Sequence, residues 1–241
     1  MFREIKKKII ILENRKPYTR EILAYMEEFN MVDWIHSSLK LDGSSLSREA
    51  VSKILKGELI IDATLDEHMM VERFKQAIRL ANNMSDMGTD LNIKCLFQFY
   101  EALAAPDYAQ YRRSNPVLRT FNYNPPHPYD IEEQMELVID WYNKDRCDEN
   151  PILKAVILHN KIIEVYPFEI LSETVARMAM NYTLIRNGYP SVGIQMKETD
   201  YNNAIAAYIK NEEIQPLYSA IERSIYNKLE VMLQITGTNE F

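Results

Sequence analysis

The feature that most constrains this chain is a helical spacing of apolar residues that recurs along most of its length. In residues 18–40, the apolar side chains lie three or four positions apart, at Ile22, Met26, Phe29, Val32, Ile35 and Leu39. This spacing places them on one face of a helix, and that face needs another element to cover it. The chain has only six glycines, and most of them fall where such helices are expected to end. The pattern predicts an all-α fold.

Start and stop signals predict where further helices lie. Thr64 and Glu67 have the spacing of a capping box. Asn150 and Pro151 give a cap followed by a first-turn proline, and Gly188 stands just past Arg186 at the end of another run. The predicted helices after the first are 47–57, 64–81, 90–104, 130–145, 151–165, 173–187, 201–210 and 216–235.

One long segment breaks the helical pattern. Residues 106–128 are rich in proline and asparagine, with a short β-like piece over 117–123. This composition predicts a loop or a small hairpin, which we call the flap. We divide the chain into an N-terminal helical arm, residues 1–60, and a core, residues 61–241.

Composition narrows the class of partner. The formal net charge is -7 and 46% of the residues are hydrophobic, so the chain can bury a core but has no bulk positive charge for nucleic acid or an anionic membrane. No segment is long and apolar enough to span a bilayer, and the apolar run near the N-terminus is shorter than that of a signal peptide. The two cysteines, Cys95 and Cys147, have no metal-ligand spacing and are interpreted as reduced thiols in a cytoplasmic protein.

The four histidines do not form a metal site by spacing. His36, His68 and His127 are isolated in the sequence, and no role or metal is assigned to them. His159 lies seven residues before Tyr166 on one predicted helix, about 10 Å away along its axis. We therefore predict that His159 is a packed or capping residue.

The stretch VYPFEILSETVAR, residues 165–177, joins two predicted helices by a tight turn and lies C-terminal to the flap in the sequence. This order of parts, over residues 30–225, resembles the Fic family, whose members mostly transfer AMP from ATP to a hydroxyl of a target protein. The family signature reads HPFx[DE]GNGRxxR. The resemblance implies a Fic-type helical bundle, with ATP and Mg²⁺ as cofactors and a target protein docked along flap residues 114–124 by main-chain pairing.

Most polar positions of the signature differ here. Tyr166 stands at the catalytic histidine, Ile170 at the acidic metal ligand, and Arg177 matches the last arginine. A phenol with a reference pKa of about 10 is a poor base at neutral pH. Glu169, one position before the metal ligand, leaves a shifted Mg²⁺ contact open. The Gly-Asn-Gly-Arg loop, where the resemblance places the nucleotide phosphates, is replaced by Leu171, Ser172, Glu173 and Thr174.

A second motif lies upstream. SLKLDG, residues 38–43, resembles the family's inhibitory motif [S/T]xxxE[G/N], with Ser38 at the hydroxyl position and Asp42 in place of glutamate. By this resemblance, Asp42 contacts Arg177 and keeps it from a nucleotide. The alternative is that Asp42 and Gly43 only form a turn and that Arg177 is a solvated helix residue.

Three functions follow from these observations. The first is a protein without ordinary AMP-transfer activity that binds a partner protein along the flap, or a nucleotide weakly. The second is an active nucleotidyl or phosphoryl transferase in which Tyr166 is acceptor or nucleophile and Arg177 holds phosphate. The third is a structural module that forms a homo-oligomer through an apolar patch.

Overall fold

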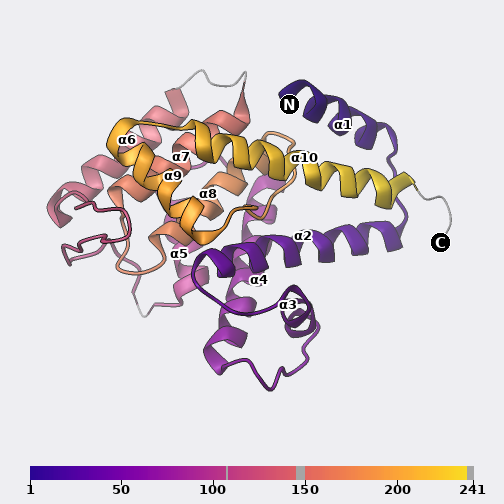
Figure 1. Ribbon diagram of the computed structural model, residues 1–241, viewed down its shortest axis with the longest axis horizontal. Helices are drawn as coiled ribbons and strands as arrows, with labels where there is room; N and C mark the ends of the chain where they lie inside the picture. Colours follow the sequence, from indigo (N-terminus) through magenta and orange to yellow (C-terminus); the bar gives the residue numbers. More distant parts are fainter. Residues whose placement is uncertain (107, 145–149, 238–241) are drawn as a thin grey trace.

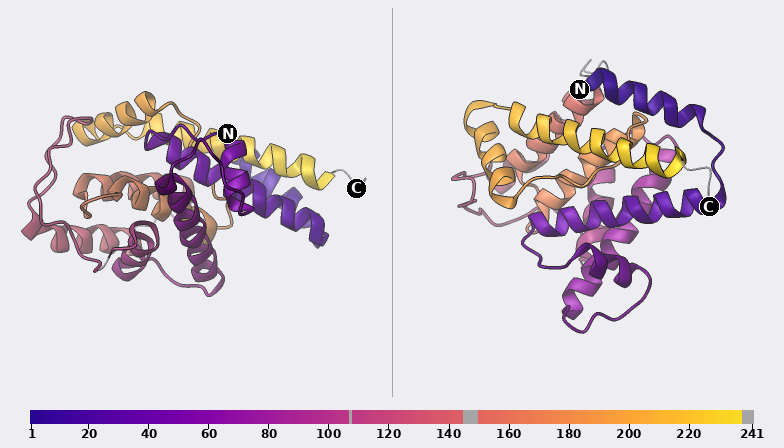
Figure 2. Two further views of the ribbon diagram at one scale, coloured as in Figure 1. Left: turned by 90° about the horizontal axis from the view of Figure 1, so that it is seen from below. Right: turned by 45° about the vertical axis from the view of Figure 1, so that its right-hand side comes forward.

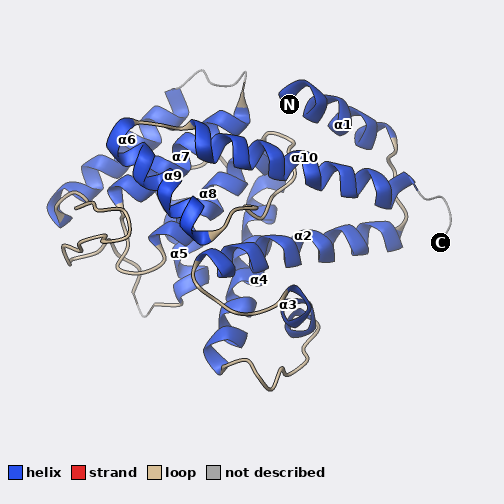
Figure 3. Ribbon diagram, viewed as in Figure 1, coloured by secondary structure: helices blue, strands red, loops and turns tan. Residues whose placement is uncertain are grey.

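The computed structural model describes residues 1–106, 108–144 and 150–237. Over these residues the fold is all-α, as predicted, and Figure 3 shows helices and loops with no strand in the described part. The elements in chain order are α1 (Phe2–Asn14), α2 (Arg20–Leu41), α3 (Arg48–Leu55), α4 (Leu65–Asp86), α5 (Ile93–Ala104), the 3₁₀ turn η1 (Pro128–Asp130), α6 (Ile131–Lys144), α7 (Pro151–Val165), α8 (Ser172–Arg186), α9 (Glu198–Asn211) and α10 (Gln215–Gly237).

The centre of the bundle is the pair α7 and α8. Both are buried on almost every side: in α8 every residue from Ser172 to Leu184 except Glu173 is buried. Helices of this kind carry apolar residues all round rather than on one stripe, and they need neighbours on every face. Helices α4 and α5 contact α8, whereas α6, α9 and α10 contact α7 (Figure 1).

The capping signals lie where the sequence placed them. Thr64 and Glu67 form the complete capping box at the start of α4, and the side chain of Asn150 accepts a hydrogen bond from the N–H of Leu153 at the start of α7. Ser47 caps α3 through the N–H of Ala50. These local side-chain bonds satisfy N–H groups that the helix itself leaves without a partner.

Helix α1 is an element that the sequence reasoning did not predict. It packs along α10, and the right-hand view of Figure 2 shows the two helices alongside each other. Ile5 and Leu12 are its buried residues. Its lysines and consecutive isoleucines fit the start of a targeting segment as well as a helix. The periodic pair Ile5 and Leu12 is the sequence signal for its buried face.

The expectation of no membrane span agrees with the helices: none of those described is long and apolar enough to cross a bilayer. Cys95 is a free thiol and is buried, and burial raises its pKa. Cys147 lies outside the described residues.

Helix α2 is tied into the bundle by a buried charge cluster. Asp33 accepts hydrogen bonds from Arg48 at 2.8 Å, from the N–H of Gly193 at 3.1 Å and from Lys228 of α10 at 3.3 Å. Burial opposes ionisation of Asp33, but its two cationic partners and the Gly193 N–H lower its pKa overall. Burial lowers the pKa of Lys228 to about 8, although Asp33 opposes this shift. A buried charge persists only with such partners.

Gly193 lets the segment after α8 lie directly against α2. A Cβ atom at this position would be 2.3 Å from the Ser37 hydroxyl oxygen and 2.5 Å from the Asp33 carbonyl oxygen. Both distances are shorter than any relaxed contact, and the carbonyl belongs to rigid helix backbone. The close approach therefore requires glycine.

We predict that Gly193→Ala lowers the free energy of unfolding by about 1–3 kcal/mol, because the added methyl group overpacks a closed contact. Urea unfolding followed by circular dichroism measures the change. The matched control is Gly237→Ala, where the nearest atoms to the new Cβ are the end of the Arg15 side chain at 3.3 Å. If both variants were equally stable, α2 would not be held against this segment as described.

Candidate active site

The turn between α7 and α8 holds two residues other than glycine in a left-handed backbone conformation. Tyr166 ends α7 with φ 50°, and Leu171 precedes α8 with φ 61°. Both values lie in the left-handed region, which costs a residue with a Cβ atom about 1–2 kcal/mol. Leu171 stands at the first glycine of the signature, and its backbone has a conformation that glycine would adopt without this cost.

Phe168 fixes this turn by packing its ring among other aromatic side chains. Its ring stacks on Tyr100 with centroids 4.2 Å apart and an interplanar angle of 6°, and it meets Phe97 edge-on at 5.5 Å. Tyr111 lies at 6.2 Å on another side. An aromatic side chain buried among three others contributes strongly to core stability. The phenylalanine of the signature's Pro-Phe pair is therefore an anchor of the turn.

Ser172 closes the turn with a local hydrogen-bonded pair. Its hydroxyl oxygen accepts from the N–H of Phe168 at 2.8 Å and donates to the carbonyl of Phe168 at 3.0 Å. The residue is fully buried. The hydroxyl is thus committed to the backbone of its own turn.

A pocket of about 310 Å³ opens beside this turn, and its walls carry negative charge. Asp42 reaches it from the end of α2, Glu173 from the start of α8 and Glu198 from the start of α9. Burial raises the pKa of Glu173, helped by Asp42 and Glu198 and opposed by Arg177. The other lining residues are Leu41, Thr120, Tyr166, Leu171, Thr174 and Asn202.

Tyr166 contributes a neutral phenol to this pocket. Burial raises its pKa to about 12, and the nearby Glu173 and Asp42 act in the same direction. Since the phenolate is the form that could take a proton, both causes disfavour Tyr166 as a general base at neutral pH.

Arg177 is buried and held from several sides. Its Nη2 donates to both carboxylate oxygens of Asp42, at 2.6 and 2.5 Å, and its Nε donates to the Ser38 hydroxyl at 2.7 Å. The side chain is only 2% exposed. Burial opposes the charge of Arg177, but Asp42 and then Tyr201 raise its pKa overall.

The predicted contact between Asp42 and Arg177 is therefore present, and the solvated alternative for Arg177 is wrong. The turn alternative holds at the same time, because Asp42 ends α2 and Gly43 follows with φ 86°. Thr174, at the first arginine of the signature, donates its hydroxyl to Asp42 at 3.1 Å and accepts from Arg177 at 3.0 Å. Ser38, Asp42 and Thr174 thus share one guanidinium.

The hydrogen bonds continue from Arg177 into the core. Tyr201 of α9 accepts from Arg177 at 3.5 Å, and its hydroxyl lies 2.8 Å from Nε2 of His159. His159 is fully buried, as predicted, and burial lowers its pKa to about 3. Sequence reasoning missed Tyr201: its helical spacing with Ile205 and Tyr208 indicates a buried face, but nothing local pairs it with an arginine 24 positions earlier.

The residues at the metal position do not fit Mg²⁺. Ile170, where the signature has its acidic ligand, is 56% exposed and offers no donor atom. Glu169 turns toward the flap, where its carboxylate accepts hydrogen bonds from Arg113 and Ser114. Within the described ranges, no group of three or more His, Cys, Asp or Glu side chains could hold a metal ion.

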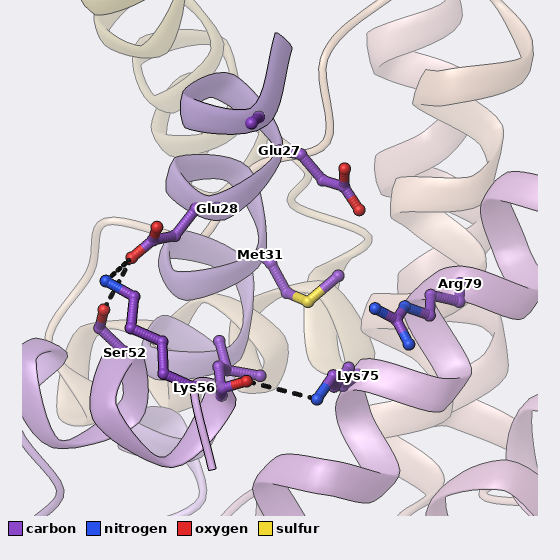
Figure 4. Close-up of a pocket in the computed structure, with 9 residues that line it drawn as sticks. Glu27, Glu28, Met31, Ser52, Lys56, Lys75 and Arg79 are labelled. Atoms are coloured by element: carbon purple, nitrogen blue, oxygen red, sulfur yellow. Dashed lines mark hydrogen bonds and ion pairs between the residues drawn. The ribbon is translucent and has the colours of Figure 1, made fainter. Parts of the chain in front are cut away.

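Another depression, of about 210 Å³, lies among α2, α3 and α4 and contains none of the predicted site residues (Figure 4). Glu28 pairs with Lys56 at 2.6 Å and accepts from Ser52 at 2.9 Å, while Lys75 donates to the carbonyl of Leu55 at 3.4 Å. These bonds link the three helices, and we assign the depression to their packing.

Residues 90–184 match the family model described as Fic/DOC family. The chain carries a Fic/DOC domain. The matched stretch includes the flap, the turn and Arg177, whereas Ser38 and Asp42 lie before it.

Curated relatives agree over a longer span. The chain is 22% identical over 209 residues to the protein adenylyltransferase Fic of Drosophila willistoni, which covers 84% of this chain and 42% of the relative. It is 24% identical over 227 residues to that of Aedes aegypti, covering 91% and 45%. The chain thus spans less than half of the length of these relatives.

Solved structures share the fold. A Fic domain containing signaling protein from Bacteroides thetaiotaomicron superposes with a TM-score of 0.81 at 20% identity, over 98% of this chain and 99% of that one. Fic-1 from C. elegans gives a TM-score of 0.78 at 19% identity, over 98% and 74%. At these identities the likeness shows the Fic fold.

We predict that Asp42→Ala lowers the free energy of unfolding by about 3 kcal/mol, because it leaves the buried Arg177 guanidinium without its counter-charge. Urea unfolding at neutral pH measures the change. The matched control is Asp140→Ala, which removes an exposed pair with Lys144 of 2.6 Å and should cost less than about 1 kcal/mol. Equal effects of the two substitutions would show that the Asp42–Arg177 pair is not a buried structural contact.

Proposed function

We propose that this Fic domain does not carry out ordinary AMP transfer and acts by binding a partner protein along flap residues 114–124. The observation that carries the proposal is the acidic pocket beside the turn. It presents Asp42, Glu173 and Glu198 together with a protonated Tyr166, at the place where the resemblance puts nucleotide phosphates and a catalytic base.

Phosphate binding is disfavoured by charge. A carboxylate about 4 Å from one phosphate charge costs on the order of 4 kcal/mol at an effective dielectric near 20. That is roughly a thousandfold in affinity. The cation that could offset it, Arg177, is buried and shared among Asp42, Ser38 and Thr174.

Proton transfer is disfavoured as well. Histidine titrates near neutral pH, which suits it to general-base work, whereas the pKa of Tyr166 lies near 12. The nearby His159 cannot take the role, because both ring nitrogens are bonded in the core, to Asn160 at 3.0 Å and to Tyr201 at 2.8 Å.

The flap is the part of the domain that offers backbone groups to a partner protein. The flap holds one isolated bridge, Leu118 with Tyr123, and Val117 on it is 64% exposed. An extended segment of a partner could pair with the flap backbone as an added strand. The curated relatives are named protein adenylyltransferases, and such enzymes act on proteins, which agrees with a protein partner.

An AMP-transfer assay tests the proposal. The chain is incubated with α-³²P-labelled ATP, Mg²⁺ or Mn²⁺ and a lysate, and transferred label is read on a gel. We expect label at background, equal to that of Tyr166→Phe, because the pocket lacks both a base and a phosphate site.

Label that this chain transfers and that Tyr166→Phe does not would contradict the proposal. It would favour the active transferase in which Tyr166 is acceptor or nucleophile. Label on the chain itself at Tyr166, found by peptide mapping, would identify the acceptor role.

A further inference from the structure

The buried side chain of Arg112 donates hydrogen bonds to two points of the flap that are far apart in sequence, Ser114 and Pro126. Its Nη1 donates to the carbonyl of Ser114 at 2.8 Å, and its Nη2 donates to the carbonyl of Pro126. The side chain is 2% exposed. Since Ser114 and Pro126 flank residues 115–125 of the flap, one guanidinium closes this part of the flap at its base (the irregular loop at the left of Figure 1).

The same side chain joins the flap to the turn that precedes α8. Arg112 Nε donates to the carbonyl of Tyr166 at 2.7 Å and Nη2 to that of Val165 at 3.4 Å. The backbone N–H of Arg112 donates to the carbonyl of Pro167 at 2.9 Å. Three consecutive carbonyls of the turn therefore accept from one residue at the start of the flap.

Glu169, which lies in the turn, holds the flap in the opposite direction, because its carboxylate accepts hydrogen bonds from flap residues. Its Oε1 accepts from the N–H groups of Arg113 at 2.7 Å and Ser114 at 3.0 Å, and its Oε2 accepts from the Ser114 hydroxyl at 2.5 Å. The Ser114 hydroxyl is the largest cause that lowers the pKa of the Glu169 carboxyl; burial opposes it, and the two backbone donors add to the lowering. Charged acceptors on backbone N–H groups make comparatively strong hydrogen bonds.

The flap needs an external hold because it has little structure of its own. Within the part of the chain that is described, its only ladder contact is the Leu118 and Tyr123 bridge, with a few tight-turn bonds around it. A segment of this length loses considerable conformational entropy when its shape is fixed. The turn can supply the hold, since Phe168 anchors it in the core next to Glu169.

We infer that Arg112 and Glu169 are positioning residues for the flap, and that the turn replacing the family's catalytic loop serves as the base that fixes the flap in its docking shape. The inference rests on the proposed function only in the use of the flap for docking. A preorganised edge binds a partner segment at a lower entropic cost than a mobile one.

Hydrogen–deuterium exchange of the full chain tests this without a partner. We expect Glu169→Ala to speed exchange of amides 113–124 about tenfold, since three charge-assisted bonds are lost, and to leave amides of α7 and α8 unchanged. Glu169→Gln, which keeps an acceptor oxygen, should restore protection to within about threefold of the original. The control is Glu133→Ala, an exposed residue on α6, with no expected effect.

Flap exchange within about twofold of the original in Glu169→Ala would overturn the inference. Equal acceleration in α8 would also overturn it, because it would indicate a general stability role. Arg112→Lys keeps the positive charge but loses the several N–H donors of the guanidinium. It should therefore speed amide exchange near both Ser114 and Pro126. If Glu169→Ala loosened the flap and the intact chain also transferred AMP, the proposed function would be wrong, but this inference would still hold.

Discussion

The buried pair of Arg177 and Asp42 is the constraint on which the arrangement of this domain depends. A guanidinium in the middle of a helical core needs a counter-charge, because an unpaired buried charge costs several kcal/mol. Asp42 at the end of α2 supplies it, and Ser38 one turn earlier adds a second acceptor. The pair therefore fixes the end of α2 against α8, and the Asp33 cluster and Gly193 fix the same helix at a second point.

The turn after α7 shows that buried neighbours can hold a residue with a side chain in a conformation suited to glycine. Leu171 takes this left-handed conformation, at φ 61°, because Phe168 and Ser172 fix the turn on both sides. What has changed is what faces the pocket: a protonated phenol and carboxylates. The contacts of Glu169 and Arg112 give this turn a structural use that does not need a nucleotide.

The sequence could predict the helices with strong local signals, and its resemblance to the Fic family implied the contact between Asp42 and Arg177. Thr64 with Glu67 and Asn150 with Pro151 mark helix starts by chemistry that acts within four residues. Helix α1 was not predicted, because its lysines and isoleucines also fit a targeting segment. Tyr201, Arg112 and Lys228 were missed for another reason: their partners lie far away in sequence, and a single chain gives no signal for such pairs.

Nucleotide affinity tests the central claim most directly, namely that the pocket beside the turn repels a triphosphate. ATP with Mg²⁺ is titrated calorimetrically into the intact chain and into Glu173→Gly, which removes one carboxylate from the pocket. We predict no saturable heat below about 1 mM for the intact chain and tighter binding for the variant. Saturable, metal-dependent binding of the intact chain at about 10 µM or tighter, unchanged in Glu173→Gly, would contradict the claim.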